Sequence, residues 1–401
     1  MRTLLVLGAG EDQLPTYREA RRLGLRTIGV DRNPAAVAVS EADEFLRVST
    51  RDPRKVRRAL GRRSIAGVTS PASDASALSV RALALAFGTP FCVSWAAARA
   101  SIDKTVFRRL VDELGLTSYG WVAGACSPEL HARARELAFP LAVKPTDSSG
   151  SKGISIVEDL DGLESAITLA ARAGYGGEVI VEEFVDGVHM SAECLIAAHR
   201  PSFMAIVQRT ITPLPRAITV EQMMPATVAD VTALELERAI ARICGALDLE
   251  RGPLNLDFVI SPSGQVRLIE MAARSGGNGI PGLVGQLYGV NLTAAAIKIA
   301  LGEPVDVQPR IGGVGLLRIL QAPRHGVVTA VSGIDAIRAM PEVVGVELFA
   351  AVGSTVSPYT AAGNKIGYLT VVGATSDDAR AALERALELL RLEIAPVPDK
   401  N

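Results

Sequence analysis

The stretch Lys144-Pro-Thr-Asp-Ser-Ser-Gly-Ser-Lys-Gly153 lies between two apolar runs, FPLAV and ISIV. The apolar runs predict two β-strands, and the serines and glycines between them predict the loop that joins the strands. This loop has two interpretations: a plain exposed hairpin loop, or a flexible flap whose backbone amides and lysine ammonium group hold a polyphosphate. The sequence around the loop has to decide between them.

Composition narrows the class of protein. A chain of 401 residues exceeds one ordinary core, so two or three domains are expected. Its 48% hydrophobic and 21% charged residues describe a folded, soluble protein, and its net charge of −1 argues against broad binding to nucleic acid or anionic membranes. No apolar run approaches the ~18 residues of a membrane span, so we expect a cytoplasmic protein.

The cysteines and the N-terminus give no sign of secretion. Cys92, Cys126, Cys194 and Cys244 lack CxxC spacing and lie in or near apolar runs. They are therefore predicted to be small core residues in a reducing compartment, and neither a zinc site nor a disulfide framework is expected. The N-terminal segment MRTLLVLGAG has no cleavage pattern and predicts a first strand that ends in a glycine turn.

Three regions follow one another along the chain. Residues 1–100 alternate short strands with helices, which predicts a doubly wound parallel α/β sheet. Residues 101–310 contain the glycine-rich loop, further strands and an amphipathic helix, and residues 311–401 predict a small α+β region. The GAG turn and Asp31 resemble part of a dinucleotide fingerprint, but no third glycine opens a helix, so they support the sheet more than they support NAD.

Two acidic residues end apolar segments of a predicted hairpin, PLNLDFVISPSGQVRLIE. Because the chain turns at residues 261–264, Asp257 and Glu270 are expected side by side on adjacent strands, facing one cleft. Two buried carboxylates repel each other unless a cation neutralises them, and magnesium suits such a pair. The alternative is two solvated residues on an exposed hairpin, which their apolar surroundings disfavour.

Two further features have open interpretations. Arg274 follows Glu270 by four residues and leads into SGGNG, so it either offers a donor fork to a carboxylate or oxyanion, or pairs structurally with an acid. The segment VEEFV at residues 181–185 either binds a purine edge, with a nearby carboxylate taking the exocyclic amine, or is an ordinary surface strand end.

In their order and spacing, DKTVFRRLVDELGL, AVKPTDSSGSKGI, VEEFVDG, LDF and LIEMAAR resemble the ATP-grasp superfamily over nearly the whole chain. The likeness is greatest to its carboxylate–amine ligases and its carbamoyl-phosphate-synthase-like members. It implies a pre-ATP-grasp domain at 1–100, an ATP-grasp domain of two α+β lobes at 101–310 with a lid subdomain at about 115–190, and a C-terminal region at 311–401.

The resemblance also implies a set of site residues. Asp257 and Glu270 would hold Mg²⁺, with Mn²⁺ as a substitute, and Arg274 would meet the acyl phosphate. The residues in contact with ATP would be Lys104, Lys144, the lid residues Ser148, Ser149, Gly150, Ser151 and Gly153, the adenine hinge Glu182, Glu183, Phe184 and Val185, and His189. His189 stands where the family places a ribose-binding acid, and its alternative is a strand histidine that faces solvent. We assign Lys152 no catalytic role.

The chain departs from the family pattern at one metal position. Members commonly read Glu-x-Asn-x-Arg, whereas this chain reads Glu270-Met-Ala272-Ala-Arg274, which puts a second magnesium in doubt. Asn255 lies two residues before Asp257 on the same strand face and is a candidate substitute.

The implied reaction transfers the γ-phosphoryl group of ATP to a small-molecule carboxylate, after which an amine attacks and phosphate leaves. Residues 70–74 and the segment 209–221, with Arg209, Arg216 and Glu221, are candidates to line the acceptor site. Three alternatives stay open: a bicarbonate-dependent carboxylating enzyme, an NAD-dependent oxidoreductase and a non-catalytic ATP-binding protein. The resemblance is also compatible with a homodimer.

Overall fold

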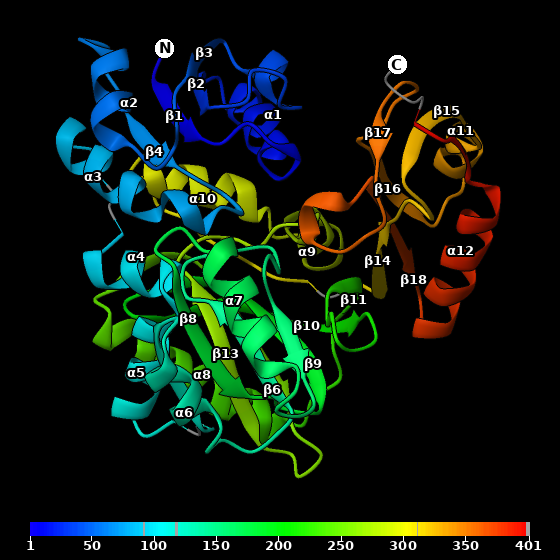
Figure 1. Cartoon of the computed structure of the whole chain (residues 1–401). Helices are drawn as coiled ribbons and strands as arrows, with labels where there is room; N and C mark the ends of the chain where they lie inside the picture. Colours follow the sequence, from blue (N-terminus) through cyan, green and yellow to red (C-terminus); the bar gives the residue numbers. More distant parts are fainter. Residues whose placement is uncertain (91–92, 117–118, 311, 398–401) are drawn as a thin grey trace.

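The computed structural model describes residues 1–90, 93–116, 119–310 and 312–397. Its N-terminal part is a parallel four-stranded sheet in the order β3-β2-β1-β4, at the upper left of Figure 1. Its strands are β1 (Thr3–Leu7), β2 (Arg26–Asp31), β3 (Glu44–Arg47) and β4 (Gly67–Thr69), and its helices are α1 (Leu14–Arg22), α2 (Pro53–Leu60) and α3 (Ala77–Phe87). Asp31 accepts hydrogen bonds from the N–H groups of Ala9 and Asn33, so it fixes the turn after β1.

A second four-stranded sheet, in the order β5-β8-β6-β7, carries the loop 144–153. Its strands are antiparallel: β5 (Trp121–Ala125), β6 (Leu141–Pro145), β7 (Ser155–Val157) and β8 (Glu178–Glu183). Helices α6 (Pro128–Ala134) and α7 (Leu163–Ala173) pack on it through their buried faces. Helices α4 (Trp95–Ile102) and α5 (Lys104–Glu113) connect it to the N-terminal sheet.

The third sheet has eight strands in the order β13-β12-β9-β10-β11-β14-β18-β16. The strands are β9 (Val188–Ala197), β10 (Arg200–Ile211), β11 (Thr219–Met224), β12 (Arg251–Ile260), β13 (Val266–Ala272), β14 (Val314–Leu320), β16 (Val343–Leu348) and β18 (Gly367–Gly373). The helices associated with it are α8 (Asp230–Ala246), α9 (Ile280–Tyr288) and α10 (Leu292–Ala300), of which α10 also reaches under the N-terminal sheet. Because β14 pairs with β11, the C-terminal strands extend the central sheet.

The remaining elements form a small C-terminal layer, at the right of Figure 1. They are β15 (Gly326–Ser332), β17 (Thr355–Val356), β19 (Arg391–Ala395), α11 (Ile334–Arg338) and α12 (Ser376–Leu389). The predicted fold class is therefore confirmed: a parallel N-terminal α/β sheet, a central part of two α+β lobes, and a small C-terminal α+β region.

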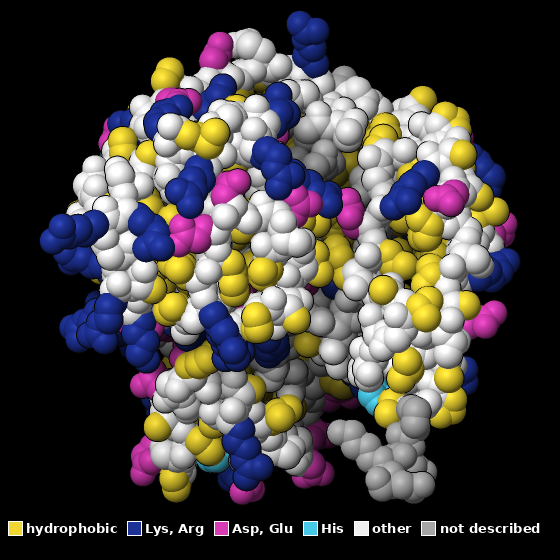
Figure 2. Space-filling model, turned by 90° about the horizontal axis from the view of Figure 1, so that it is seen from above, with side chains coloured by type: hydrophobic (Ala, Val, Ile, Leu, Met, Phe, Trp, Pro, Cys, Tyr) yellow, Lys and Arg dark blue, Asp and Glu magenta, His cyan; other side chains and the backbone are white. Residues whose placement is uncertain are grey.

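Surface charge, helix hydrophobicity and cysteine burial bear on three of the predictions. Lysine and arginine side chains alternate with acidic ones over the face in Figure 2, in line with the net charge of −1. In the described part of the chain no single helix is long and apolar enough to cross a membrane, although α9 and α10, bent by 109°, pass that test as a pair. Cys194 and Cys244 are buried as predicted, Cys126 is exposed and corrects the prediction, and Cys92 lies outside the described residues.

Candidate active site

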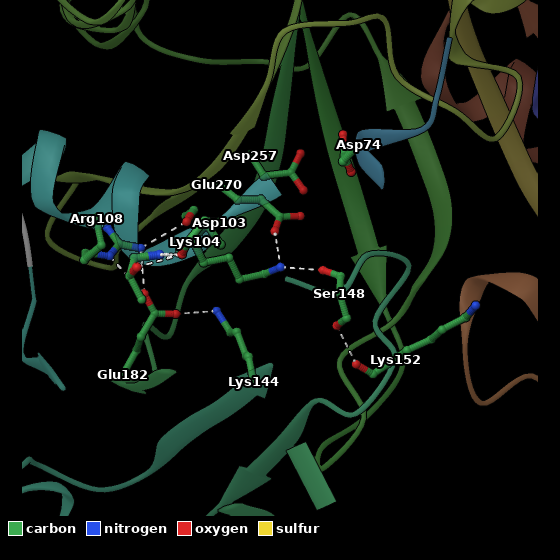
Figure 3. Close-up of polar contacts among 12 residues, drawn as sticks. Asp74, Asp103, Lys104, Arg108, Lys144, Ser148, Lys152, Glu182, Asp257 and Glu270 are labelled. Carbon is green, nitrogen blue, oxygen red and sulfur yellow. Dashed lines mark hydrogen bonds and ion pairs between the residues drawn. The ribbon is translucent and has the colours of Figure 1, made fainter. Parts of the chain in front are cut away.

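The loop that follows Lys144 folds over the N-terminus of α5. Asp103 caps that helix by accepting from the Thr105 N–H at 2.9 Å, which places Lys104 in its first turn. The Lys104 ammonium donates to the Ser148 carbonyl at 2.6 Å and lies 3.5 Å from Glu270 (Figure 3). Gly153 ends the loop at φ +72, where a Cβ would lie 2.4 Å from that of Ala173. The loop is therefore held next to the carboxylates by Lys104.

A buried ion-pair relay fixes Lys144. Glu182 accepts from Arg108 at 2.9 Å and from Lys144 at 2.6 Å, and only 2% of Glu182 is exposed (Figure 3). Burial alone would raise the pKa of Glu182, but Lys144 and Arg108 outweigh it and lower the pKa to about 2. Arg108 also donates to the Leu268 carbonyl at 2.7 Å, and this ties the relay to β13. Lys144 is thus pre-positioned at the cleft.

The first of two adjoining hollows is the lysine cleft, between the loop-bearing sheet and the central sheet. It is lined by Lys104, Lys144, Ser151, the hinge residues Glu182, Glu183, Phe184 and Val185, His189, Arg209, Asp257 and Glu270, among others. Glu183 accepts from the N–H groups of Gly120 and Ala138, and Glu182 is held in the relay. Both carboxylates are therefore already engaged within the chain, and binding of an exocyclic amine by either one stays a prediction.

His189 lies half-buried against the lysine cleft. Burial, followed by the nearby positive charges of Arg209 and Lys144, lowers its pKa from 6.5 to about 4. The imidazole is therefore neutral at physiological pH, and it can donate or accept a hydrogen bond without carrying charge.

Asp257 and Glu270 are directly paired neighbours on β12 and β13, as the hairpin predicted. Arg209 on β10 forms an ion pair with Asp257. Burial raises the pKa of Asp257, and the positive charge of Arg209 offsets part of this rise. Within the described residues, no three His, Cys, Asp or Glu side chains are grouped to hold a metal by themselves. Two adjacent carboxylates at a cleft still suit magnesium, because this ion takes one or two protein carboxylates and completes its shell with water and substrate phosphates.

The second hollow is the polar cavity, of about 220 Å³, where all three parts of the chain meet. Its lining includes Asp12, Asp74, Ser149, Gly150, Ser191, Gln222, Asn255, Arg274 and Tyr359. It shares Ser151, Arg209, Asp257 and Glu270 with the lysine cleft, so the two carboxylates stand at the boundary between the hollows. Arg274 forms a two-pronged ion pair with Asp74 at 2.8 and 3.0 Å.

Comparison with known proteins agrees with this geometry. The family model of the ATP-grasp domain matches residues 137–281, and that of the L-amino acid ligase C-terminal domain 2 matches residues 318–395. The chain contains an ATP-grasp domain. The match covers the loop 144–153, the hinge and both carboxylates.

Relatives of this chain carry several names. It is 27% identical to the formate-dependent phosphoribosylglycinamide formyltransferase of Bacillus subtilis, over 97% of this chain and 98% of that protein. It is 29% identical to the uncharacterized protein y4rH of Sinorhizobium fredii over 74% of its own length, and the match spans 62% of y4rH. The L-amino acid ligase of Bacillus licheniformis has the same fold, with a TM-score of 0.84 at 18% identity over 98% of this chain and 99% of that one.

Two of the predicted acceptor residues, Arg216 and Glu221, lie outside the polar cavity. Arg216 is exposed and lines neither hollow. Glu221 is buried and forms ion pairs with Arg318 and Arg380. Its neighbour on β11, Gln222, lines the polar cavity instead. Alternation along a strand sends the two side chains to opposite faces, and the sequence alone did not tell which face bears the site. Lys152 points away from the cluster in Figure 3.

Asn255 does reach the polar cavity, but its amide nitrogen donates to Glu193 at 2.7 Å. Glu193 also accepts from the Gly276 N–H at 3.0 Å, where a Cβ on Gly276 would lie 2.1 Å from the carboxylate. The glycine is therefore what lets the SGGNG loop approach Glu193 so closely. Asn255 as a metal ligand stays a prediction.

Sequence reasoning missed Arg108 and Glu193 as parts of this site, and it included Asp74 in the candidate loop 70–74 without predicting its ion pair with Arg274. Arg108 had a detectable signal, because it follows Lys104 by one helical turn and lies on the buried face of α5 among apolar residues. Glu193 and the pairing of Asp74 with Arg274 had none, since the partners are far apart in the sequence.

Buried Glu193 should make the stability of the ligand-free protein depend on pH. Burial raises its pKa from 4.5 to about 7, so this carboxyl favours folding below pH 4.5, and its contribution is lost as the pH rises to about 7. Glu193→Gln, which stays neutral, should become more stable relative to the natural protein between pH 5 and 8, by up to about 3 kcal/mol. Thermal unfolding across that range measures the difference. A difference that does not change with pH would contradict the assignment.

Proposed function

We propose that this chain is an ADP-forming ligase that activates a small-molecule carboxylate as an acyl phosphate and joins it to an amine. The observation that carries the proposal is the position of Asp257 and Glu270, which line both the lysine cleft and the polar cavity. A nucleotide in the first hollow would present its γ-phosphate to a substrate in the second. The names of the relatives, a formyltransferase and an L-amino acid ligase, are in keeping with chemistry on carboxylates and amines.

The residues of the lysine cleft suit ATP. Lys104 and Lys144 would offset charge on the phosphates, residues 148–153 would cover them, and the hinge 182–185 would hold the adenine through its backbone. Magnesium, when held by Asp257 and Glu270, would supply positive charge to the phosphate oxygens. Magnesium and Arg209 would compete for the Asp257 carboxylate. Binding of magnesium would therefore free Arg209 to bind a substrate oxygen.

The two steps balance without any further reactant. A carboxylate oxygen of the acid forms a bond to the γ-phosphorus as the bond from that phosphorus to ADP breaks. The amine nitrogen then bonds to the activated carbonyl carbon, inorganic phosphate leaves with the bonding pair, and the nitrogen loses a proton. Arg274 lies at the polar cavity, where its guanidinium would meet the acyl phosphate. The loop 148–153 would exclude water, which otherwise hydrolyses this intermediate.

The test is to trap the acyl phosphate with hydroxylamine. Purified protein with MgATP and a panel of carboxylic acids should release ADP and form a hydroxamate with at least one acid, identified by mass. ATP turnover that needs only bicarbonate would favour the carboxylating alternative. ATP binding without ADP release for any acid would favour a non-catalytic protein.

A further inference from the structure

Two side chains in the polar cavity have unmet hydrogen-bonding capacity. Ser191 is 1% exposed and Gln222 is 2% exposed, and both line the cavity. The Ser191 Oγ and the Gln222 Oε1 have no hydrogen-bond partner among the residues that the structure describes. Leaving a buried polar atom without a hydrogen bond costs about 1–3 kcal/mol. Two such atoms in one cavity therefore point to a bound molecule that supplies the missing hydrogen bonds.

Strand register places both groups beside the reacting centre. Ser191 on β9 is paired directly with Asp257 on β12, and Gln222 on β11 is paired directly with Arg209 on β10. Directly paired residues project from the same face of a sheet, so Ser191 extends the row formed by Glu270 and Asp257. Gln222 stands next to Arg209, which binds Asp257. A ligand held by Ser191 and Gln222 would thus adjoin the proposed acyl phosphate.

The charges around the cavity indicate what kind of ligand fits. Its lining contains four acids, Asp12, Asp74, Asp257 and Glu270, and two arginines, Arg209 and Arg274. Each arginine already pairs with one of those acids. The nearby Lys365 is buried and held by Asp12 and Asn278, at 2.8 Å from each. In the ligand-free structure, a further phosphate group would meet acids and arginines that are already paired, whereas an amine would meet acceptors.

We propose that Gln222 and Ser191 form the binding site for the amine substrate, and that this amine carries no phosphate. The inference rests on the proposed function and names the acceptor side of that same site. The nitrogen donates a hydrogen bond to the Gln222 Oε1, an atom that can only accept, and Ser191 bonds the nitrogen or an adjoining polar atom. In this position the amine faces the carbonyl carbon that the cleft has activated.

The experiment separates amine binding from acid activation. Hydroxylamine is a small nucleophile that reports acyl phosphate formation, whereas amide formation is measured with ammonium, ethanolamine, 1,4-diaminobutane, L-alanine and, as the phosphorylated probe, glycinamide ribonucleotide. Gln222→Met should raise the KM of the unphosphorylated amine that reacts by about tenfold. The hydroxamate yield and the KM values for ATP and the acid should stay within twofold.

Two variants guard against a merely structural effect. Gln222→Glu keeps an acceptor oxygen in place and should retain an amine KM much closer to that of the natural protein than Gln222→Met does. Gln308→Met, at an exposed position, should change nothing. The proposal is overturned if Gln222→Met leaves the amine KM unchanged, if hydroxamate formation falls in parallel, or if glycinamide ribonucleotide is the only amine used. An absence of hydroxamate in the natural protein would instead refute the proposed function, and the inference with it.

Discussion

Glu270→Gln should lower acid-dependent ADP release about 10³-fold, because a metal ion contributes several kcal/mol to transition-state charge stabilisation and each 1.4 kcal/mol is tenfold in rate. Glutamine keeps the shape of the side chain but not its charge, and it removes the repulsion between residues 270 and 257 on paired strands. The fold should survive, but with an unfolding temperature somewhat below that of the natural protein. Although burial opposes the charge of Glu270, the nearby positive charges, with Lys104 first, lower its pKa overall, so its charge favours folding. Steady-state ADP release at saturating ATP and magnesium measures the loss.

The matched control for this prediction is Glu178→Gln, which makes the same substitution at an exposed position at the start of β8. It should keep full activity. If Glu270→Gln retained more than a tenth of the activity, Glu270 could not be a metal ligand in the reaction. The Lys104 ion pair at 3.5 Å would then be its main contact.

Arg108→Met should produce the largest loss of stability, about 3–5 kcal/mol in the free energy of unfolding, the usual cost of removing one partner of a buried ion pair. Arg108 is 1% exposed, and it donates to Glu182 and to the carbonyls of Leu268 and Ile269. Methionine fills much of the space but leaves the two carbonyls without this donor and Glu182 with Lys144 as its remaining cation. Urea unfolding of the ligand-free protein measures the change.

A control and a second substitution make the prediction specific. Arg109→Met alters the next residue of the same helix, at an exposed position, and should change stability by less than about 0.5 kcal/mol. Adding Glu182→Gln to Arg108→Met removes the stranded charge and should restore part of the loss, as a double-mutant cycle would show. Equal effects of Arg108→Met and Arg109→Met would mean that the relay contributes nothing to stability.

How much of the site was predictable from sequence depended on the distance between partners along the chain. Asp257 and Glu270 belong to one hairpin, and a short turn with alternating residues is enough to bring them together. Arg274 was predicted as a donor near these acids, yet its partner Asp74 lies 200 residues away. Glu221 and Gln222 show the limit most clearly, since the periodicity of a strand separates two faces but does not say which one meets the ligand.

The local sequence pattern by itself determined the N-terminal α/β sheet, the loop after Lys144 and the paired carboxylates, because strand periodicity, turn residues and short spacings are properties of neighbouring residues. The two-lobed central part was predicted from the family resemblance. The tertiary structure decided the rest. It joined Arg108, Glu182 and Lys144 into one relay, extended the central sheet with the C-terminal strands, and brought Ser191 and Gln222 into one cavity. Those contacts depend on which sheets stack and in what register, and such packing is the sum of many weak long-range interactions that no single stretch of sequence records.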